Sequence, residues 1–167
     1  NNPNKEKFKN ICYDLINYLK EFKNKDGLLE SLDSWNFIEW SKANNWVKDV
    51  SYPTNMLYAK MINLIGNWYN DRNFITESKN IRKKIIGQAF DGEYFIDNAI
   101  RQEDGSLKIT ENRSEVCQYY AFFFEVMEKG DEQFHQLKDI ILNTFGPKRK
   151  QKGIMPEIAY ANAFIGN

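Results

Sequence analysis

A chain of 167 residues has the length of one ordinary domain, and its 42% hydrophobic content can support a core. Its 23 lysines and arginines are balanced by 23 aspartates and glutamates, so the formal net charge is zero. A neutral chain has no strong field to draw it to nucleic acid or to an anionic membrane. The longest apolar run, Tyr119–Phe124, is far too short to span a bilayer. We therefore expect neither nucleic acid nor a membrane as a partner.

Helical periodicity dominates the chain, since apolar residues recur at three- and four-residue steps. The predicted elements are, in chain order, helices over residues 4–24, 54–70 and 76–90, strands at 94–96 and 107–110, and helices that begin after Ser114, after Asp131 and at Pro156. Asp26–Gly27 supplies the end of the first helix, because glycine accepts a left-handed backbone. Pro53 suits the start of the second helix, and Thr76 is a good N-cap for the third. Asp104–Gly105 is the turn signal between the strands.

The cysteines and the histidine limit the redox and metal chemistry. Cys12 and Cys117 each fall on the apolar side of a predicted helix and lack a CxxC partner, so we expect buried free thiols, with a disulfide left open. His135 is the single histidine, which excludes zinc sites with several imidazoles. The residues Asn1–Lys5 lack the apolar stretch of a signal peptide, which favours the cytoplasm and leaves the periplasm and secretion open.

The segment Asp33–Trp40 places two carboxylates and two indoles within eight residues, between two helical patterns. Carboxylates hydrogen-bond hydroxyls or move protons, and flat indoles stack on the apolar face of a pyranose. Loops above a rigid scaffold often carry function. The segment therefore predicts a sugar-binding cleft that includes Asp33, Trp35, Glu39 and Trp40. The alternative is that its aromatic side chains fill the gap between two helices.

Polar residues at two helix starts extend this prediction. Asn55 opens the second helix, whose free backbone N–H groups can hold sugar hydroxyls, although ordinary capping explains this motif equally well. Glu115 opens the fourth helix, where it faces a cleft together with Gln118 or simply complements the helix dipole. The acids of Asp91–Asn98 do not match the spacing of an EF-hand, so we expect a turn before a strand and no metal.

Several segments together resemble a known family. They are Trp35–Asn44, Tyr52–Lys60, Asp91–Asn98, Ser114–Phe123 and Glu157–Gly166, and they are similar, in this order, to the six-hairpin domain of bacterial α-L-rhamnosidases. The resemblance implies an α/α toroid of six helical hairpins that hydrolyses terminal α-rhamnosides with inversion and without a cofactor. Inversion uses one carboxylic acid and one carboxylate base roughly 6.5–9.5 Å apart.

The resemblance also implies that residues 1–167 are a single fragment of such a catalytic domain. We expect an all-α fold of antiparallel helical hairpins, about half of the toroid, with a small β-hairpin near residues 94–110. The family's acid-bearing segment precedes the matched region and its base-bearing segment follows it, so the catalytic pair is expected outside this chain. Within the chain, Glu39 is the candidate for proton transfer. Asp33, Trp35, Trp40, Asn55 and Glu115 are the candidate contacts to a carbohydrate substrate.

Two alternatives stay open. A complete helical-repeat module would use the same aromatic loops to bind a glycan or a peptide without chemistry. A hydrolase of the same architecture would act on a sugar other than rhamnose. A partial toroid exposes a hydrophobic face, so we also expect self-association or packing with the rest of the parent domain.

Overall fold

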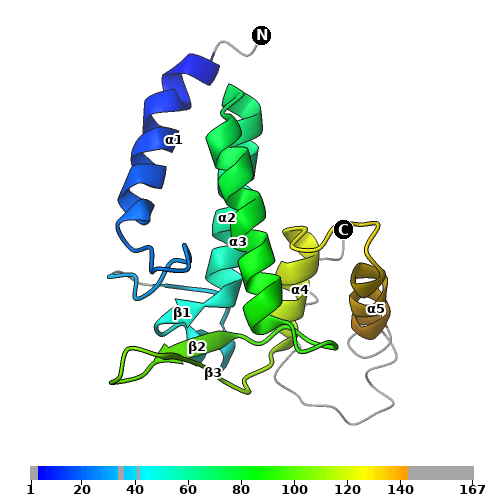
Figure 1. The fold of residues 1–167 in the computed structure, drawn as a ribbon. Coiled ribbons are helices and arrows are strands. Elements are labelled where there is room, and N and C mark those ends of the chain that lie inside the picture. The colour runs from blue at the N-terminus through cyan, green and yellow to red at the C-terminus, as the bar shows by residue number, and fades with distance from the viewer. Residues whose placement is uncertain (1–3, 34–35, 41, 143–167) are drawn as a thin grey trace.

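The computed structural model describes residues 4–33, 36–40 and 42–142. The described elements are α1 (Lys5–Lys20), the 3₁₀ helix η1 (Lys42–Trp46), β1 (Val50–Ser51), α2 (Tyr52–Tyr69), α3 (Arg72–Ala89), β2 (Asn98–Arg101), β3 (Leu107–Ile109), α4 (Glu115–Phe123) and α5 (Glu132–Ile140). The long helices α1, α2 and α3 stand side by side, and the sheet, α4 and α5 lie toward one end of them (Figure 1). The predicted helical fold with a small β-hairpin is confirmed. The helix predicted at Pro156 lies outside the described residues.

The first helix ends earlier than its sequence predicts. It stops at Lys20 rather than at residue 24. Beyond it the chain folds back on itself, with a β-bridge between Lys23 and Leu29 and with Gly27 at a φ of 78° in the turn. The side-chain oxygen of Asn24 accepts from the backbone N–H groups of Asp26 and Leu28 and so holds this turn closed. Glycine serves the turn here, not the helix end.

The hairpin of α2 and α3 is the centre of the fold. Ser51 caps α2 by accepting from the Thr54 N–H, and Pro53 lies in the first turn, as predicted. Asn70 ends α2 in the left-handed conformation, and Asp71 then caps α3 by accepting from the Asn73 N–H. The prediction that Thr76 caps α3 is therefore wrong, since the cap lies five residues earlier. Asp71 follows the left-handed Asn70 directly and is the first residue that can cap the new helix, so α3 begins before Thr76.

The three strands form one antiparallel sheet in the order β1-β2-β3. Ala99 pairs with Val50 on one side and with Ile109 on the other. The strand predicted at residues 94–96 is instead a single bridge between Phe90 and Phe95, and the hairpin begins at Asn98. Its turn contains Gly105, at a φ of 81°. The sheet closes the end of the helical layer from which α2 and α4 start (Figure 1).

The later helices begin where their capping residues predict. The Ser114 hydroxyl accepts from the Cys117 N–H at the start of α4, and Asp131 occupies the N-cap position of α5. Cys117 is a fully buried free thiol and Cys12 is a partly buried one, as expected. His135 is exposed on α5. Among the described helices, none combines the length and the hydrophobicity that crossing a bilayer requires.

Candidate functional site

The five residues 36–40, which we call the anchored loop, are held in place by their backbone and by one amide side chain. The Thr54 hydroxyl at the start of α2 donates to the side-chain oxygen of Asn36 over 2.9 Å. The Ile38 N–H donates to the side-chain oxygen of Asn44 over 2.9 Å. The Tyr120 hydroxyl of α4 donates to the Ile38 carbonyl over 3.0 Å. Contacts from α2, η1 and α4 therefore fix the loop at the meeting point of these elements.

The anchored loop presents aromatic surface to solvent. Ile38 points inward and is only 7% exposed, whereas Trp40 is 78% exposed. The Phe37 ring lies beside the Trp40 indole, with their centroids 4.8 Å apart and their planes inclined by 58°. A single buried isoleucine thus pins a loop whose neighbouring rings face outward. An exposed indole on an anchored backbone is a suitable platform for stacking a sugar ring.

Glu39 brings a carboxylate to this platform. Glu39 is half-buried, between the inward-facing Ile38 and the outward-facing Trp40. Burial raises the pKa of the Tyr120 phenol, and the negative charge of Glu39 adds to the rise. The Tyr120 hydroxyl binds the carbonyl of Ile38, the residue before Glu39. The structure therefore gathers an indole, a carboxylate and a phenol where the anchored loop meets α4. Such groups can stack on a sugar, accept hydrogen bonds from its hydroxyls and move a proton.

Asp33 lies at the other end of the same segment and is directed to a different helix. It accepts a hydrogen bond from the Tyr18 hydroxyl of α1 over 2.8 Å, and both groups are exposed. Among the described residues, its hydrogen bond to Tyr18 directs it toward α1 and not toward the anchored loop. Trp35 lies outside the described residues. Their predicted roles as sugar contacts stay predictions.

Asn55 has a different position from the one predicted. It is fully buried, and its amide donates to the carbonyls of Leu29 and Ser51 and accepts from the Leu29 N–H. Both amide hydrogens are used inside the protein. We therefore assign Asn55 to holding the segment around Leu29 against α2 rather than to binding a substrate.

Glu115 and Gln118 also turn inward. Glu115 is 4% exposed in the first turn of α4, where the Tyr119 hydroxyl donates to its carboxylate. Gln118 is fully buried, and its amide pairs with both backbone groups of Phe95. Of the two interpretations of this helix start, the one in which Gln118 faces a cleft is therefore wrong, because the amide ties α4 to the segment before the sheet. Of the predicted site residues, the structure brings Glu39 and Trp40 together, and Glu115 lies on the helix that anchors them.

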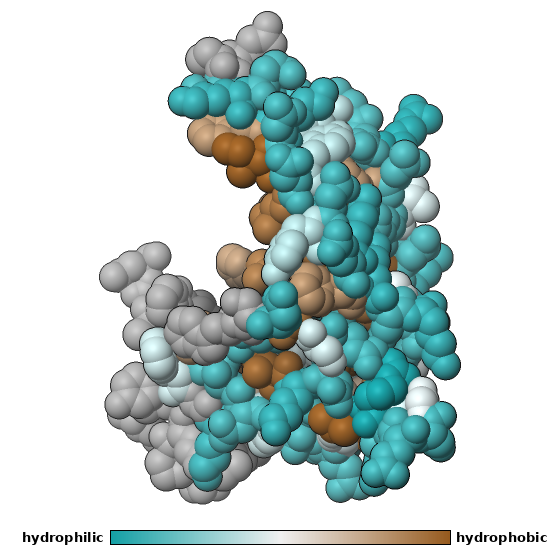
Figure 2. Space-filling view, turned by 90° about the vertical axis from the view of Figure 1, so that its left-hand side faces the viewer, coloured by the Kyte–Doolittle hydropathy of each residue, from teal (hydrophilic) through white to brown (hydrophobic). Residues whose placement is uncertain are grey.

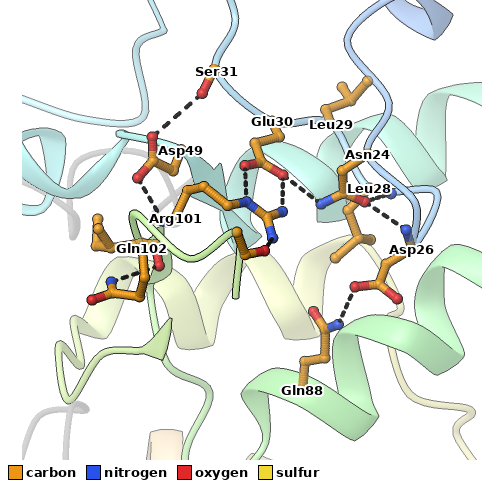
Figure 3. Close-up of polar contacts among 12 residues, drawn as sticks. Asn24, Asp26, Leu28, Leu29, Glu30, Ser31, Asp49, Gln88, Arg101 and Gln102 are labelled. Carbon is orange, nitrogen blue, oxygen red and sulfur yellow. Dashed lines mark hydrogen bonds and ion pairs between the residues drawn. The ribbon is translucent and has the colours of Figure 1, made fainter. Parts of the chain in front are cut away.

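A polar network that the sequence did not reveal supports the segment leading to the anchored loop (Figure 3). The Arg101 guanidinium of β2 forms two hydrogen bonds with the Glu30 carboxylate, which also accepts from the Asn24 amide over 2.8 Å. These contacts with Arg101, then Asn24, hold the pKa of Glu30 below its ordinary value although burial opposes the shift. Asp26 accepts from Gln88 of α3 in the same region. Arg101 and Glu30 lie 71 positions apart, and Gln88 and Asp26 lie 62 positions apart, so no local pattern could form these two pairs.

Asp97 is a second buried acid, and it lies in the segment whose sequence predicted only a turn before a strand. It is 2% exposed, and it accepts from the Ser114 N–H and hydroxyl, each over 2.6 Å. Burial raises its pKa from 3.8 to about 6, and the hydrogen bonds from Ser114 oppose this rise. The expected turn is present at Asp91, which accepts from the N–H groups of Glu93 and Tyr94. Within the part of the chain that the structure describes, no three His, Cys, Asp or Glu side chains could hold a metal ion.

The fold and the site together define a mostly helical hairpin protein with aromatic and acidic groups beside helix α4. Among solved structures, the chain is similar to a GH78 family rhamnosidase of Bacillus sp. GL1, with a TM-score of 0.66. The two sequences are 14% identical, and the match covers 82% of this chain and 15% of the length of that protein. This likeness supports a rhamnosidase-like fold, a section of a helical toroid. No protein-family model matches the chain, and no curated protein matches it either.

Proposed function

We propose that the chain forms part of a glycoside hydrolase catalytic domain that resembles α-L-rhamnosidase, and that the anchored loop supplies one wall of its sugar-binding cleft. The fold of the GH78 rhamnosidase supports the architecture. The observation that carries the sugar contact is the exposed Trp40 indole beside Glu39, on a backbone fixed by Tyr120. Carbohydrate is the proposed partner, and neither nucleic acid nor a membrane is part of the proposal.

The proposed reaction is hydrolysis of a terminal glycoside with inversion in the full-length protein. One carboxylic acid protonates the departing oxygen, while a carboxylate takes a proton from the attacking water on the opposite face of the sugar. Glu39 is the candidate within this chain for one of these proton transfers, because its residue is half-buried next to the stacking platform. The second carboxylate would come from another segment of the parent domain.

Sugar binding by the 167-residue chain tests the proposal directly. We would titrate it with L-rhamnose, p-nitrophenyl α-L-rhamnoside and a panel of other glycosides, and follow saturation-transfer NMR and tryptophan emission. Trp40→Ala should weaken binding about tenfold, which corresponds to the loss of about 1.4 kcal/mol of stacking. Trp68→Ala is the matched control, since Trp68 is a 41% exposed indole on α2. Equal binding by Trp40→Ala and the wild type would refute this assignment.

A non-catalytic module that binds a glycan is the second candidate, and one observation favours it. Glu115, the other predicted carboxylate near α4, is 4% exposed, so the anchored loop itself presents one acid. In the full-length protein, Glu39→Gln separates the two functions. A loss of about 10²- to 10⁴-fold in kcat/KM with sugar binding retained would establish proton transfer by Glu39. Binding without any hydrolysis by the unaltered protein would establish the module.

A further inference from the structure

Helices α1 and α2 each expose a stripe of large hydrophobic side chains. The members are 41% to 62% exposed, and together we call them the apolar face: Phe8, Ile11 and Leu15 of α1 and Leu57, Leu64 and Trp68 of α2. Their helical spacing places the members of each stripe on one side of its helix. Figure 2 shows hydrophobic residues gathered in a hollow on one side of the molecule. Contiguous apolar surface of this kind marks a docking surface.

The packing of α1 is incomplete. Among its residues, all of which the structure describes, only Ile16 is buried. The Tyr13 ring faces the other helices, with its centroid 5.9 Å from that of Tyr69 on α2. Ile11 and Leu15 stand two positions before and after Tyr13, and at about 3.6 residues per turn this places them on nearly the opposite side of α1. The stripe of α1 therefore has the chemistry of a side that a further helix covers.

Helix α2 is apolar on two opposite sides as well. Ala59 and Ile62 are fully buried, and the Ala59 carbonyl accepts from the Ser78 hydroxyl, so this side faces α3. Leu57 and Leu64 each stand two positions from one of these buried residues, on nearly the opposite side of α2. A helix that is hydrophobic on all sides belongs in an interior. The exposed stripe of α2 therefore lacks a partner on the side away from α3 within the part of the chain that the structure describes.

The arrangement of α2, α3 and α4 shows where a further helix would lie. Helix α3 runs back along α2, so we call it the returning helix, and α4 then stands beside α2 in the same direction. Both α2 and α4 start at Asp97, which accepts from the N–H groups of Tyr52 and Ser114. Farther along, Lys60 of α2 pairs with Glu125 just beyond α4. One unit of the fold is thus a helix, its returning helix, and a next helix parallel to the first.

Helix α1 has the position of a returning helix one unit earlier. It runs antiparallel to α2, since the Tyr69 hydroxyl at the end of α2 donates to the carbonyl of Lys5 at the start of α1 over 2.7 Å. Residues 21–51 join α1 to α2, as residues 90–114 join α3 to α4. Helices α1 and α4 lie on opposite sides of the α2 and α3 hairpin (Figure 1). The first helix of the unit that α1 completes would stand beside α1 and α2, at the apolar face.

We propose that the apolar face is covered by a helix that directly precedes α1 in the full-length protein and runs parallel to α2. The inference rests on the proposed function in one respect, because it requires a larger parent domain, and the GH78 rhamnosidase it resembles is a much longer chain. A helix that matches the 16 residues of α1, followed by a link of about two to eight residues, lies within roughly 30 residues before Lys5. Consecutive helices joined by a short link pack as a hairpin, which favours this segment over any other cover.

Photo-crosslinking in the full-length protein tests both the identity and the direction of this helix. We would replace Leu57 or Trp68 by p-benzoylphenylalanine, irradiate, and identify the joined peptides by mass spectrometry. Both positions should attach to the stretch of roughly 30 residues before Lys5. Trp68 should attach closer to Lys5 than Leu57 does, because a helix parallel to α2 ends beside the end of α2. Lys79, which is exposed on α3, is the matched control and should not attach to this stretch.

Cysteine labelling of the same protein measures whether the face is covered. Leu64→Cys should react with a maleimide at least about tenfold more slowly in the native than in the urea-unfolded full-length protein, whereas Lys79→Cys should react at similar rates in both. Far-UV circular dichroism would confirm that the variants fold.

Four results would overturn the inference. They are equal labelling of Leu64→Cys in the two states, attachment to residues 143–167 or to another part of the parent domain, attachment between copies in an isotopically mixed sample, and the reversed order of attachment along the preceding stretch. Protection without any attachment to that stretch would count as covering by another segment. Sugar binding through Trp40 enters none of these readouts, so the failure of this inference is distinguishable from the failure of the proposed function.

Discussion

Replacing Asp97 by asparagine should change how the stability of the protein depends on pH. Asp97 is 2% exposed, and burial raises its pKa from 3.8 to about 6. The folded state therefore binds a proton more tightly than the unfolded state does. The contribution of this group to stability is fully present below pH 3.8, and it is lost as the pH rises through about 6. The difference of about two pKa units corresponds to about 3 kcal/mol in total.

Part of this contribution falls within a convenient range. Between pH 4.5 and pH 7.5, linkage predicts that ionisation of Asp97 lowers the free energy of unfolding by about 2 kcal/mol. Asparagine does not ionise, so the Asp97→Asn chain should lack this decrease. The amide cannot accept from both the N–H and the hydroxyl of Ser114 as the carboxylate does, so the variant also loses a pH-independent amount of about 1 kcal/mol. The test is therefore the pH dependence of the difference in the free energy of unfolding, and not its pH-independent part.

The assay is urea unfolding of both chains across this pH range at constant ionic strength, followed by circular dichroism. The wild-type free energy minus that of the variant should fall as the pH rises. Asp91→Asn is the control of opposite sign. Desolvation acts to raise the pKa of Asp91, but hydrogen bonds from the N–H groups of Tyr94 and Glu93 and the charge of Arg113 hold this pKa below its ordinary value. Removing that acid should cost more stability at neutral than at acid pH. Parallel curves for wild type and Asp97→Asn would refute the reasoning.

Three further predictions concern single contacts, each measured by thermal and urea unfolding. Tyr120→Phe removes the hydrogen bond to the Ile38 carbonyl, so it should lower the free energy of unfolding by about 1 kcal/mol and speed proteolysis within residues 36–40. Tyr18→Phe, which removes an exposed hydrogen bond to Asp33, should have neither effect. Equal cleavage rates in the two variants would contradict the anchoring role of Tyr120. Arg101→Ala leaves the partly buried Glu30 carboxylate without its cation, so it should lower the free energy of unfolding more than Arg113→Ala does at its more exposed pair. Equal losses would count against the network. Gly66→Ala should lower the free energy of unfolding by about 1–3 kcal/mol, because a Cβ at this position meets atoms of Asp71, Phe74 and Ile75 at 3.0 Å. Gly87→Ala, where a Cβ meets no atom within 4 Å, should stabilise α3. A Gly66→Ala chain as stable as the wild type would show that the hairpin can open at no cost.

The helices follow from local physics that the sequence carries. Ser114 caps α4 through a bond to an N–H three residues away, a contact that needs no other part of the chain. The turn around Gly105 joins strands that are neighbours along the chain. The end of α1 shows the limit of this reasoning, since the bridge between Lys23 and Leu29 removes residues that continue the helical pattern.

The candidate site follows from the sequence only in part. An indole and a carboxylate adjacent in the chain, Trp40 and Glu39, predict the kind of chemistry, and both lie in the anchored loop as an outward and a half-buried group. Polar residues at helix starts are a poor guide to the site, because the same residue types occur there whether the side chain faces a ligand or the core. Asn55 faces the core, where it satisfies the backbone of Leu29.

The sequence by itself determined which segments form the main helices and the hairpin, though not all of their ends, because apolar spacing and capping act over three or four residues. The tertiary structure alone decided which acids are buried, that Arg101 pairs with Glu30, and that Tyr120 anchors Ile38. These contacts join residues 71 and 82 positions apart, and the cost of burying a polar group depends on what the rest of the chain places beside it.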